Sequence, residues 1–225
     1  MANSCEHCLF ISNAASKLSG TQIERLSSNC ASITLKRGDL LMQQGALSSN
    51  IAYLKTGLAK IHITGPYHEQ IIKLIKAPTY LGIPNTFGDK INNYSVTVVE
   101  PSSVCFIDLD TFKYLLAQND KFAYEIMLIL CNYEIESFKK CALRTQKQIR
   151  GNIADVLLDL SKRIYDSPTF NLPLSRNEIG NLIDTSRESV SRIFSEFEND
   201  GIISVAGKKI DILDMIKLQL ISDNG

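Results

Sequence analysis

Between residues 30 and 110 the apolar positions form short runs, and glycines stand between or beside them. The predicted strands are Ile33–Leu35, Asp39–Met42, Ile51–Lys55, Ala59–Ile63, Gln70–Ile75, Tyr94–Val99 and Ser103–Asp108. Each run has the length of a strand, and the glycines supply turns that require positive φ. This pattern predicts a jelly-roll-like double-stranded β-helix over residues 19–120. A short helix, Ser19–Asn29, precedes its first strand.

After Asp110 the period of the apolar positions becomes that of an α-helix. The spacing alternates between four and three residues in Tyr124, Leu128, Cys131, Ile135, Phe138, Ala142, Thr145 and Ile149. Such a row predicts one long helix whose seam pairs with a second copy of the chain. The alternative is that the row packs against its own domain, but the row is longer than one small domain can cover. Gly151 interrupts the helix as a candidate hinge, and Asn152–Tyr165 is a second amphipathic helix.

The segment from Ser175 to Ile203 has the pattern of two short helices joined by a tight turn. Ser175 and Glu178 form an S-x-x-E capping box at the start of the first helix. Asp184-Thr185-Ser186 makes the turn, and the second helix is capped by Ser186 or, alternatively, by Thr185 with Glu188 at its third position. The buried face of that helix is predicted from its apolar row, Val190, Ile193, Phe194 and Phe197. The segment therefore predicts a helix-turn-helix that Gly201 ends.

Four polar residues remain on the outward face of the second helix, namely Arg187, Glu188, Ser191 and Arg192. An arginine can donate two hydrogen bonds to guanine and a carboxylate can accept one from cytosine, so this face is suited to read bases in a major groove. The alternative is a solvated helix face with an ion pair between Glu188 and Arg192.

A β-hairpin is predicted after the second helix, from Ile202–Val205 and Lys209–Leu213. It makes the motif a winged helix-turn-helix, in which Lys208 and Lys209 near the hairpin tip contact phosphates. Together with the capping residues Ser175 and Ser186, Lys208 completes the predicted set of DNA-contacting side chains.

Composition fits two modest soluble domains: the chain has 225 residues, 44% of them hydrophobic and 21% charged. The net charge is zero, but Lys139–Arg192 holds ten basic residues against six acidic ones. A basic strip of this kind permits DNA binding with modest non-specific affinity. No apolar run approaches the ~20 residues that span a bilayer, and the N-terminus has no secretory signal, so we expect a cytoplasmic protein that does not bind membranes.

Motifs typical of enzymes are absent from the sequence. There is no glycine-rich phosphate loop before a helix, no H-E-x-x-H and no local nucleophile–base pair, so we do not expect an enzyme. The alternative to a DNA-binding regulator is a ligand-binding or protein-interaction module whose winged helix contacts protein instead of DNA.

The motif EIGNLIDTSRESVSR, Glu178 to Arg192, resembles the DNA-binding signature of the CRP/FNR family of bacterial transcription regulators. Supporting matches are Lys36–Asp39, Gly45, Tyr53–Gly57 and Ile149–Gly151, and the resemblance covers nearly the full chain. By this likeness Arg187, Glu188 and Arg192 read bases, while Ser191 matches a serine of the FNR-like branch.

The resemblance implies an α+β fold with four parts. These are an N-terminal segment (1–18), a cyclic-nucleotide-binding-type β-roll (19–120), a dimerisation helix with a hinge (121–150) and a winged helix-turn-helix (151–225). It also implies a homodimer that binds a pseudo-palindromic operator in double-stranded DNA and works with RNA polymerase.

The resemblance also implies an effector pocket in the roll, lined by Gly82, Tyr94, Ser95, Ser137 and Phe138. The cyclic-AMP-responsive branch has Gly-Glu-Leu-Gly and Arg-Ser in its phosphate-binding segment. This chain has Thr79-Tyr80-Leu81-Gly82 and Tyr94-Ser95 instead. Without the arginine there is no bidentate partner for a cyclic phosphate, and without the glutamate no acceptor for the ribose hydroxyl. We therefore expect that the roll does not bind cyclic AMP.

The cysteines suggest a different cofactor. Cys5 and Cys8 form a C-x-x-C, and Cys105 resembles the roll cysteine of the oxygen-sensing FNR branch, which holds an iron–sulfur cluster with four thiolates. A further N-terminal cysteine of that branch is missing here. Cys30 could replace it, but at the end of a predicted helix it is more simply a core residue. Heme bound by His62 or His68 is another alternative, so the effector stays open, and no other metal site is predicted.

Overall fold

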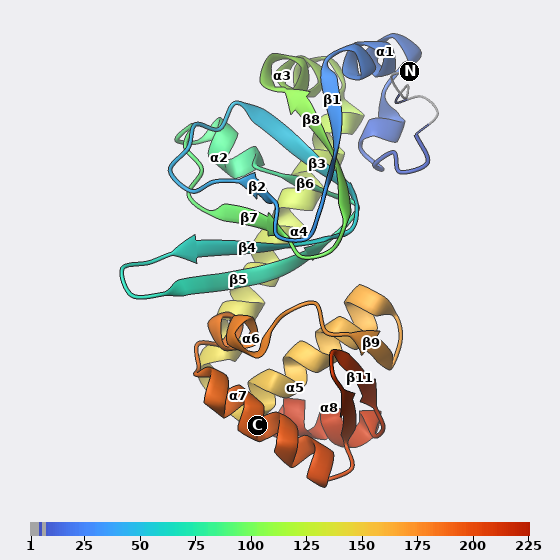
Figure 1. The fold of residues 1–225 in the computed structure, drawn as a ribbon. Coiled ribbons are helices and arrows are strands. Elements are labelled where there is room, and N and C mark those ends of the chain that lie inside the picture. The colour runs from blue at the N-terminus through green and yellow to red at the C-terminus, as the bar shows by residue number, and fades with distance from the viewer. Residues whose placement is uncertain (1–4, 6–7) are drawn as a thin grey trace. The chain divides into compact units, whose positions relative to one another are not determined.

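The computed structural model describes residue 5 and residues 8–225, without the side chains of residues 143–145. The chain divides into two compact units, Met1–Thr64 with Ile72–Glu136 and Gly65–Ile71 with Ser137–Gly225. Figure 1 shows the fold of both units and labels most of their elements. The division between the units falls inside the long helix, whereas the sequence predicted domain boundaries at either end of it.

In residues 30–108, all of which are described, eight strands form the two four-stranded sheets of a β-roll (Figure 1). One sheet has the order β1(Cys30–Leu35), β8(Ser102–Asp108), β3(Asn50–Thr56), β6(Thr79–Leu81). The other has the order β2(Leu40–Met42), β7(Ser95–Val98), β4(Leu58–Thr64), β5(Glu69–Lys76). All seven predicted strands are confirmed, and β6 is an additional strand.

The interior of the roll is filled by apolar side chains from both sheets. Because successive residues of a strand face opposite sides, Ala52 and Leu54 of β3 point into this interior, while Ile51 and Tyr53 point to the outer face. The interior core comprises Leu41, Met42, Ala52, Leu54, Ala59, Ile61, Ile75, Leu81, Val96 and Val104. Burial of each large apolar side chain contributes about 1.5–3 kcal/mol, so this packing holds the sheets together.

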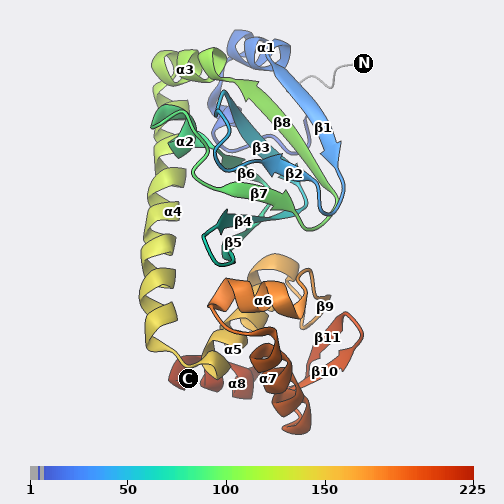
Figure 2. The same ribbon diagram turned by 60° about the vertical axis from the view of Figure 1, so that its left-hand side comes forward.

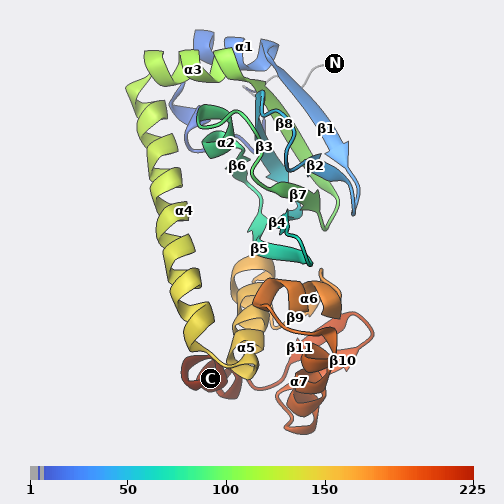
Figure 3. The same ribbon diagram turned by 90° about the vertical axis from the view of Figure 1, so that its left-hand side faces the viewer.

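Helices cover the outer face of the β1–β8–β3–β6 sheet. α1(Gly20–Ser28) and α3(Leu109–Gln118) lie side by side at one end of the roll, as Figures 2 and 3 show. A second core lies beneath them and includes Leu26 of α1 and Phe112 of α3. The N-terminal segment enters this core through Ala14 and Ala15, where the 3-10 turn η2(Ala15–Lys17) begins. The short helix α2(Ile83–Phe87) follows β6.

The long helix is shorter than the sequence predicted. α4(Asp120–Gln146) is separated from α3 by Asn119, which has an extended backbone. The Asn119 side chain accepts a hydrogen bond from Phe122 N–H at 2.8 Å and thereby caps α4. At its other end α4 stops at Gln146, so Ile149, which we placed on this helix, belongs to the next one.

The second unit holds the winged helix-turn-helix. Its helical elements are α5(Ile149–Asp159), the π-helical segment η3(Leu160–Tyr165), α6(Arg176–Ile183), α7(Arg187–Asn199) and α8(Met215–Asn224). Its sheet has the order β10(Ile203–Ala206), β11(Lys209–Ile212), β9(Thr169–Asn171). The predicted hairpin is confirmed as β10 and β11, and β9 adds a third strand beside β11. The helix α8 was not predicted.

Gly151 does not interrupt a helix, which corrects the predicted hinge. It is buried in the first turn of α5, and a Cβ there would lie 2.9 Å from the backbone of Gly225, so glycine permits a close backbone approach. The break between α4 and α5 lies at Lys147 and Gln148 instead. Lys147 Nζ bonds both carboxylate oxygens of Asp155 at 2.8 and 2.7 Å, which ties the break to α5.

Candidate functional site

The helix-turn-helix forms where the sequence predicted it. The capping box is present, with Ser175 Oγ accepting from Glu178 N–H and Glu178 Oε2 accepting from Ser175 N–H at 2.9 Å. Asp184 ends α6 at φ 60°, a left-handed conformation that aspartate tolerates better than most residues. Ser186 then caps α7 by accepting from Ser189 N–H at 3.1 Å.

Gly180 lets the turn pack onto α6. A Cβ at this position would lie 2.5 Å from Thr185 O, a distance that no side chain could occupy without moving the turn. The three nearest atoms all belong to the backbone of the turn, at Thr185 and Ser186. Gly180 therefore fixes where α7 begins relative to α6.

The α7 helix buries its apolar row and exposes its polar one. Val190, Ile193, Phe194 and Phe197 are all buried. Arg187, Glu188, Ser191 and Arg192 are all exposed, and they start at the N-terminal end of the helix. The structure thus brings the four predicted base-reading residues together on one accessible face.

The other predicted DNA-contacting residues are also exposed, but two of them already have structural roles. The hydroxyls of Ser175 and Ser186 cap α6 and α7. Lys208 lies in the turn between β10 and β11, next to Gly207 with its φ of +65°. Lys208 is the one residue of these three that does not cap a helix.

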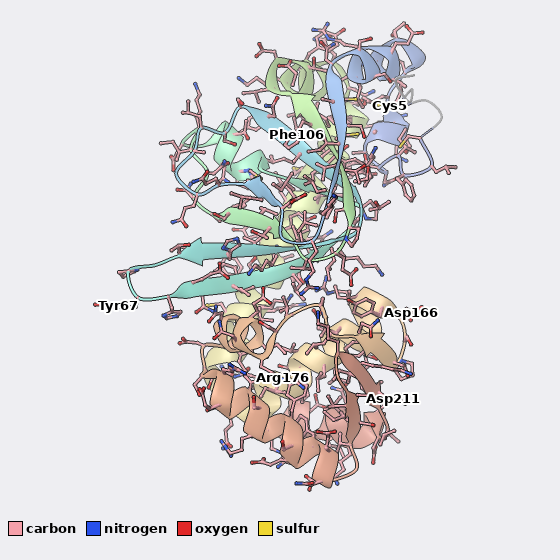
Figure 4. All side chains as sticks on the ribbon, in the orientation of Figure 1. Cys5, Tyr67, Phe106, Asp166, Arg176 and Asp211 are labelled. Carbon is pink, nitrogen blue, oxygen red and sulfur yellow. The ribbon has the colours of Figure 1, made fainter. Side chains whose placement is uncertain are left out.

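Sequence reasoning missed two arginines that support α7. Arg176, at the start of α6, has its guanidinium 3.3 Å from the centroid of the buried Phe194 ring, and Figure 4 labels it beside α7. Arg150, in α5, donates to Glu196 of α7 at 3.3 Å and to Asp200 at 2.6 Å. Arg192 also pairs with Glu196, at 2.9 Å, and among the described residues it does not pair with Glu188 as the alternative had it. The spacing of residues along the sequence does not predict such contacts between separate helices.

The predicted seam of α4 is an exposed apolar row in the single chain. Tyr124 is 56% exposed, Ile135 51% and Phe138 67%, and Leu128, Cys131 and Ala142 are also exposed. The opposite face of the helix packs into the outer core of the roll through Phe122 and Ile126. The row is therefore not used by the helix's own domain, and single-chain packing does not account for it.

Three of the predicted effector-pocket residues, Gly82, Tyr94 and Ser95, lie in the roll and contact other protein atoms. The Tyr94 hydroxyl forms a hydrogen bond with the Gly82 backbone, and burial raises the pKa of this hydroxyl. A Cβ at Gly82 would lie 3.0 Å from Met42 Cε, so this methionine occupies the space beside the glycine. Ser95 Oγ is buried and accepts from Gln44 N–H at 3.0 Å. Ser137 and Phe138 are exposed on α4 and belong to the second unit.

Four cysteines line one cavity of the first unit. Cys5, Cys8, Cys30 and Cys105 surround it together with Tyr53 and Tyr80. The sulfur atoms of Cys5 and Cys30 are 3.7 Å apart. Cys30 does not lie at the end of a helix as predicted. It is the first residue of β1, opposite Ile107, and so lies two positions along from Cys105 on the same face of the sheet. Only the strand register brings it to the other thiols.

The N-terminal segment is held against the roll by several hydrogen bonds. Ser27 Oγ accepts from Cys5 N–H at 2.8 Å, and Tyr53 donates to Phe10 O at 2.7 Å. Asn13 donates to Glu125 of α4 at 2.6 Å. Figure 4 shows Cys5 in this segment beside α1. The segment thus forms one wall of the cysteine cavity and contacts the long helix.

The thiols of the cavity differ in acidity. A hydrogen bond with Cys30 lowers the pKa of Cys5 to about 6, against the opposing effect of burial. The pKa of Cys105 is also lowered to about 6, chiefly by its own hydrogen bond with Cys30 and further by Lys55. These bonds raise the pKa of Cys30. Cys5 and Cys105 therefore favour the thiolate, which is the form that binds metals.

No three His, Cys, Asp or Glu side chains of the described chain converge on a point where a single metal ion could be held. The two histidines considered as heme ligands lie in different environments. His62 is buried, with Nε2 2.8 Å from Thr97 Oγ1, whereas His68 is exposed. No helix among the described residues is long and apolar enough to cross a membrane.

Comparison with known proteins identifies both units. A cyclic nucleotide-binding domain model matches residues 32–119, and a Crp-like helix-turn-helix domain model matches residues 152–221. The chain is 30% identical over 191 residues to the transcriptional activator protein Anr of Pseudomonas aeruginosa, a match that covers 82% of this chain and 77% of the relative. The transcriptional activator protein FnrA of Stutzerimonas stutzeri is similar to the same extent.

Solved structures agree on the fold. FixK2 from Bradyrhizobium japonicum superposes with a TM-score of 0.77 at 15% identity, covering 85% of this chain and 96% of that one. A transcriptional regulator of the CRP/FNR family from Eubacterium rectale gives 0.79 at 15% identity, covering 95% and 99%. With its two matching domain models and its relatives among transcriptional activators, the chain belongs to the CRP/FNR family and is a DNA-binding transcription regulator.

Proposed function

We propose that this regulator binds a pseudo-palindromic site in double-stranded DNA as a homodimer, with one α7 helix in each of two successive major grooves. The observation that carries the proposal is the register of α7, which exposes Arg187, Glu188, Ser191 and Arg192 on one face. Residues at the N-terminal end of such a helix reach base edges, and two copies related by a dyad read half-sites ~34 Å apart.

The exposed row of α4 supports the homodimer. Its spacing is that of a two-stranded coiled coil, in which each apolar residue packs between residues of the partner helix. An uncovered row with Phe138 67% exposed and Tyr124 56% exposed is otherwise an aggregation hazard. Because the relatives are transcriptional activators, we also propose RNA polymerase as a partner, which a gel-shift assay of polymerase on the chain–DNA complex tests.

Selection from a library of random duplexes tests the proposed DNA site. We expect the purified chain to enrich an inverted repeat whose half-sites are centred about 10 base pairs apart, with a guanine contact in each. The enriched sequence is called the preferred duplex below. Enrichment of an asymmetric site would contradict binding as a symmetric homodimer. Enrichment of no sequence at all would favour a module that contacts protein.

We also propose that the cysteine cavity of the first unit binds an iron–sulfur cluster, through which the protein detects its signal. Cys5, Cys8, Cys30 and Cys105 give the four thiol ligands that an iron–sulfur cluster needs, and they line one cavity without converging on a point. Cys30 would replace the N-terminal ligand that the FNR-like pattern lacks in this sequence. When bound, the cluster would supply redox-sensitive chemistry.

The position of the cavity supports a sensor role. Cys5, Cys30 and Cys105 pack against the same core that receives Phe122 and Ile126 of α4. A change at the thiols would therefore alter packing beneath the helix that carries the proposed dimer seam. For this to regulate DNA binding, the loaded and unloaded forms must differ in their preference for two arrangements of the dimer.

Cyclic AMP is not the proposed effector. The interior of the roll is packed with apolar side chains, Met42 lies beside Gly82, and Tyr94 uses the Gly82 backbone that a phosphate would otherwise approach. A saturable heat on titration with cyclic AMP would contradict this part of the proposal.

Purification without oxygen tests the cluster. We expect bound iron and acid-labile sulfide with broad visible absorption. In Cys30→Ser and in Cys105→Ser we expect the iron content per chain to fall roughly tenfold or more below that of wild type. Cys141→Ser, at an exposed cysteine of α4, should retain it. Iron without sulfide would indicate heme instead. A colourless, metal-free protein, or full iron content in Cys30→Ser, would overturn the four-thiol ligand set.

A further inference from the structure

Glu196 links the exposed Arg192 to the first turn of α5. Its Oε1 accepts a hydrogen bond from Arg192 Nη1 at 2.9 Å, and its Oε2 accepts one from Arg150 Nη1 at 3.3 Å. The Arg192 side chain is 63% exposed, whereas those of Glu196 and Arg150 are 34% and 36% exposed. One carboxylate therefore joins a side chain on the proposed DNA-reading face to one that lies half-buried behind it.

Arg150 is itself held on two sides. Its Nη2 donates to Asp200 Oδ2 at 2.6 Å, and its guanidinium carbon lies 5.2 Å from the centroid of the Phe197 ring, which is fully buried. Charge-assisted hydrogen bonds and contact with an aromatic face both restrict an arginine. Arg150 is thus a fixed point, and it fixes the second oxygen of Glu196.

This anchoring changes what the Arg192–Glu196 pair does. An isolated exposed pair four residues apart orders its side chains only weakly. Here the carboxylate is already positioned, so Arg192 pairs with a fixed partner and loses part of its rotamer freedom before it meets DNA. Ordering a side chain in the free protein reduces the entropy cost of binding.

The charge of Glu196 also limits where Arg192 can bind. Phosphate contacts carry no sequence information, and an unpaired arginine will make them on any duplex. A carboxylate that holds the guanidinium opposes such contacts through its own repulsion of phosphate. A neutral residue at position 196 would instead leave the cations Arg150 and Arg192 close together with no anion between them.

We propose that Glu196 is a positioning residue that sets DNA specificity: it orients Arg192 for one base contact and withholds its charge from phosphates. This inference rests on the proposed function, since it requires that α7 reads DNA. Arg150 acts through Glu196, and Arg192 is the residue that touches the base.

The test measures the affinity of wild type, Glu196→Gln and Asp200→Asn for the preferred duplex and for a scrambled duplex of the same composition, by fluorescence anisotropy at several salt concentrations. Both substitutions remove one negative charge from the same network, but only Glu196 contacts Arg192. The amide oxygen in Asp200→Asn still accepts a hydrogen bond from Arg150, and the contact of Arg150 with Phe197 is unchanged, so the anchoring of Glu196 is retained. We expect both variants to bind the scrambled duplex a few-fold more tightly. Only Glu196→Gln should reduce the ratio of the two affinities, by about fivefold to tenfold.

A second readout identifies the base. Glu196→Gln should lose discrimination at the same base pair as Arg192→Ala, whereas Asp200→Asn should keep it. Equal affinity ratios for Glu196→Gln and Asp200→Asn, with matching melting curves, would overturn the inference while leaving the DNA-binding function intact. A wild-type chain that does not distinguish the two duplexes would instead overturn the proposed function.

Discussion

Ile135→Asp is expected to turn the dimer into monomers and to lower affinity for the preferred duplex by about 10²–10⁴-fold. Ile135 lies in the middle of the exposed row of α4 and is 51% exposed in the single chain. In a paired seam the new carboxylate would be buried without a partner, which is strongly unfavourable. A monomer would engage one half-site at a time and lose the gain that comes from linking two contacts.

Sedimentation velocity and anisotropy measure the two parts of this prediction separately. Ser137→Asp is the matched control, because it adds the same charge to the same helix at an exposed position outside the row. It should leave both association and affinity near the wild-type values. If Ile135→Asp remains a dimer with undiminished affinity, the row is not the seam.

Arg192→Ala is expected to lower affinity for the preferred duplex by about 10- to 100-fold and to relax the preference for one base pair in each half-site. A bidentate arginine–guanine contact provides about 1–3 kcal/mol of discrimination. Arg192 lies on the outward face of α7, and its change to alanine leaves the buried row of that helix untouched. The fold of the variant should therefore be unchanged by circular dichroism.

Lys208→Ala provides the contrast, since Lys208 is exposed in the hairpin turn and is predicted to contact phosphate. Its loss should weaken binding to all duplexes alike and reduce the dependence of log affinity on log salt by about one unit. Arg192→Ala that weakened binding uniformly, with its base preference retained, would place Arg192 among the phosphate contacts instead.

The DNA-reading motif was predictable because its determinants are local. Ser175 with Glu178, Asp184, Ser186 and Gly201 each act on neighbouring backbone, and all of them have the predicted roles in the structure. The apolar row of α7 needs only a helical period to be placed inward. The strands of the roll were likewise readable from short apolar runs bounded by turns.

Features that depend on pairing between distant segments were not predictable. Cys30 joins the other thiols only because β1 pairs with β8 in a register that places Ser32 opposite Cys105. The Arg150–Glu196 contact likewise depends on how α5 packs against α7. No spacing within the chain encodes either arrangement.

The C-terminal end of the long helix was predicted wrongly for a different reason. The apolar row begins inside α4 at Tyr124 but continues past the last residue of α4, Gln146, to Ile149 in the next helix. Asn119 caps the start of α4, and a break at Lys147 and Gln148 separates α4 from α5, which begins at Ile149. Gly151 does not mark this break, because the glycine is required for a close approach to the end of α8. Periodicity thus identifies a helix better than it bounds one.

The central claim is that two copies of α7 read one symmetric DNA site, and the number of chains per duplex tests it most directly. Sedimentation equilibrium would compare the preferred duplex with a duplex that keeps a single half-site. We predict two chains on each preferred duplex and binding to the half-site duplex that is weaker by about 10²-fold or more. One chain per duplex, with equal affinity for both, would contradict the account.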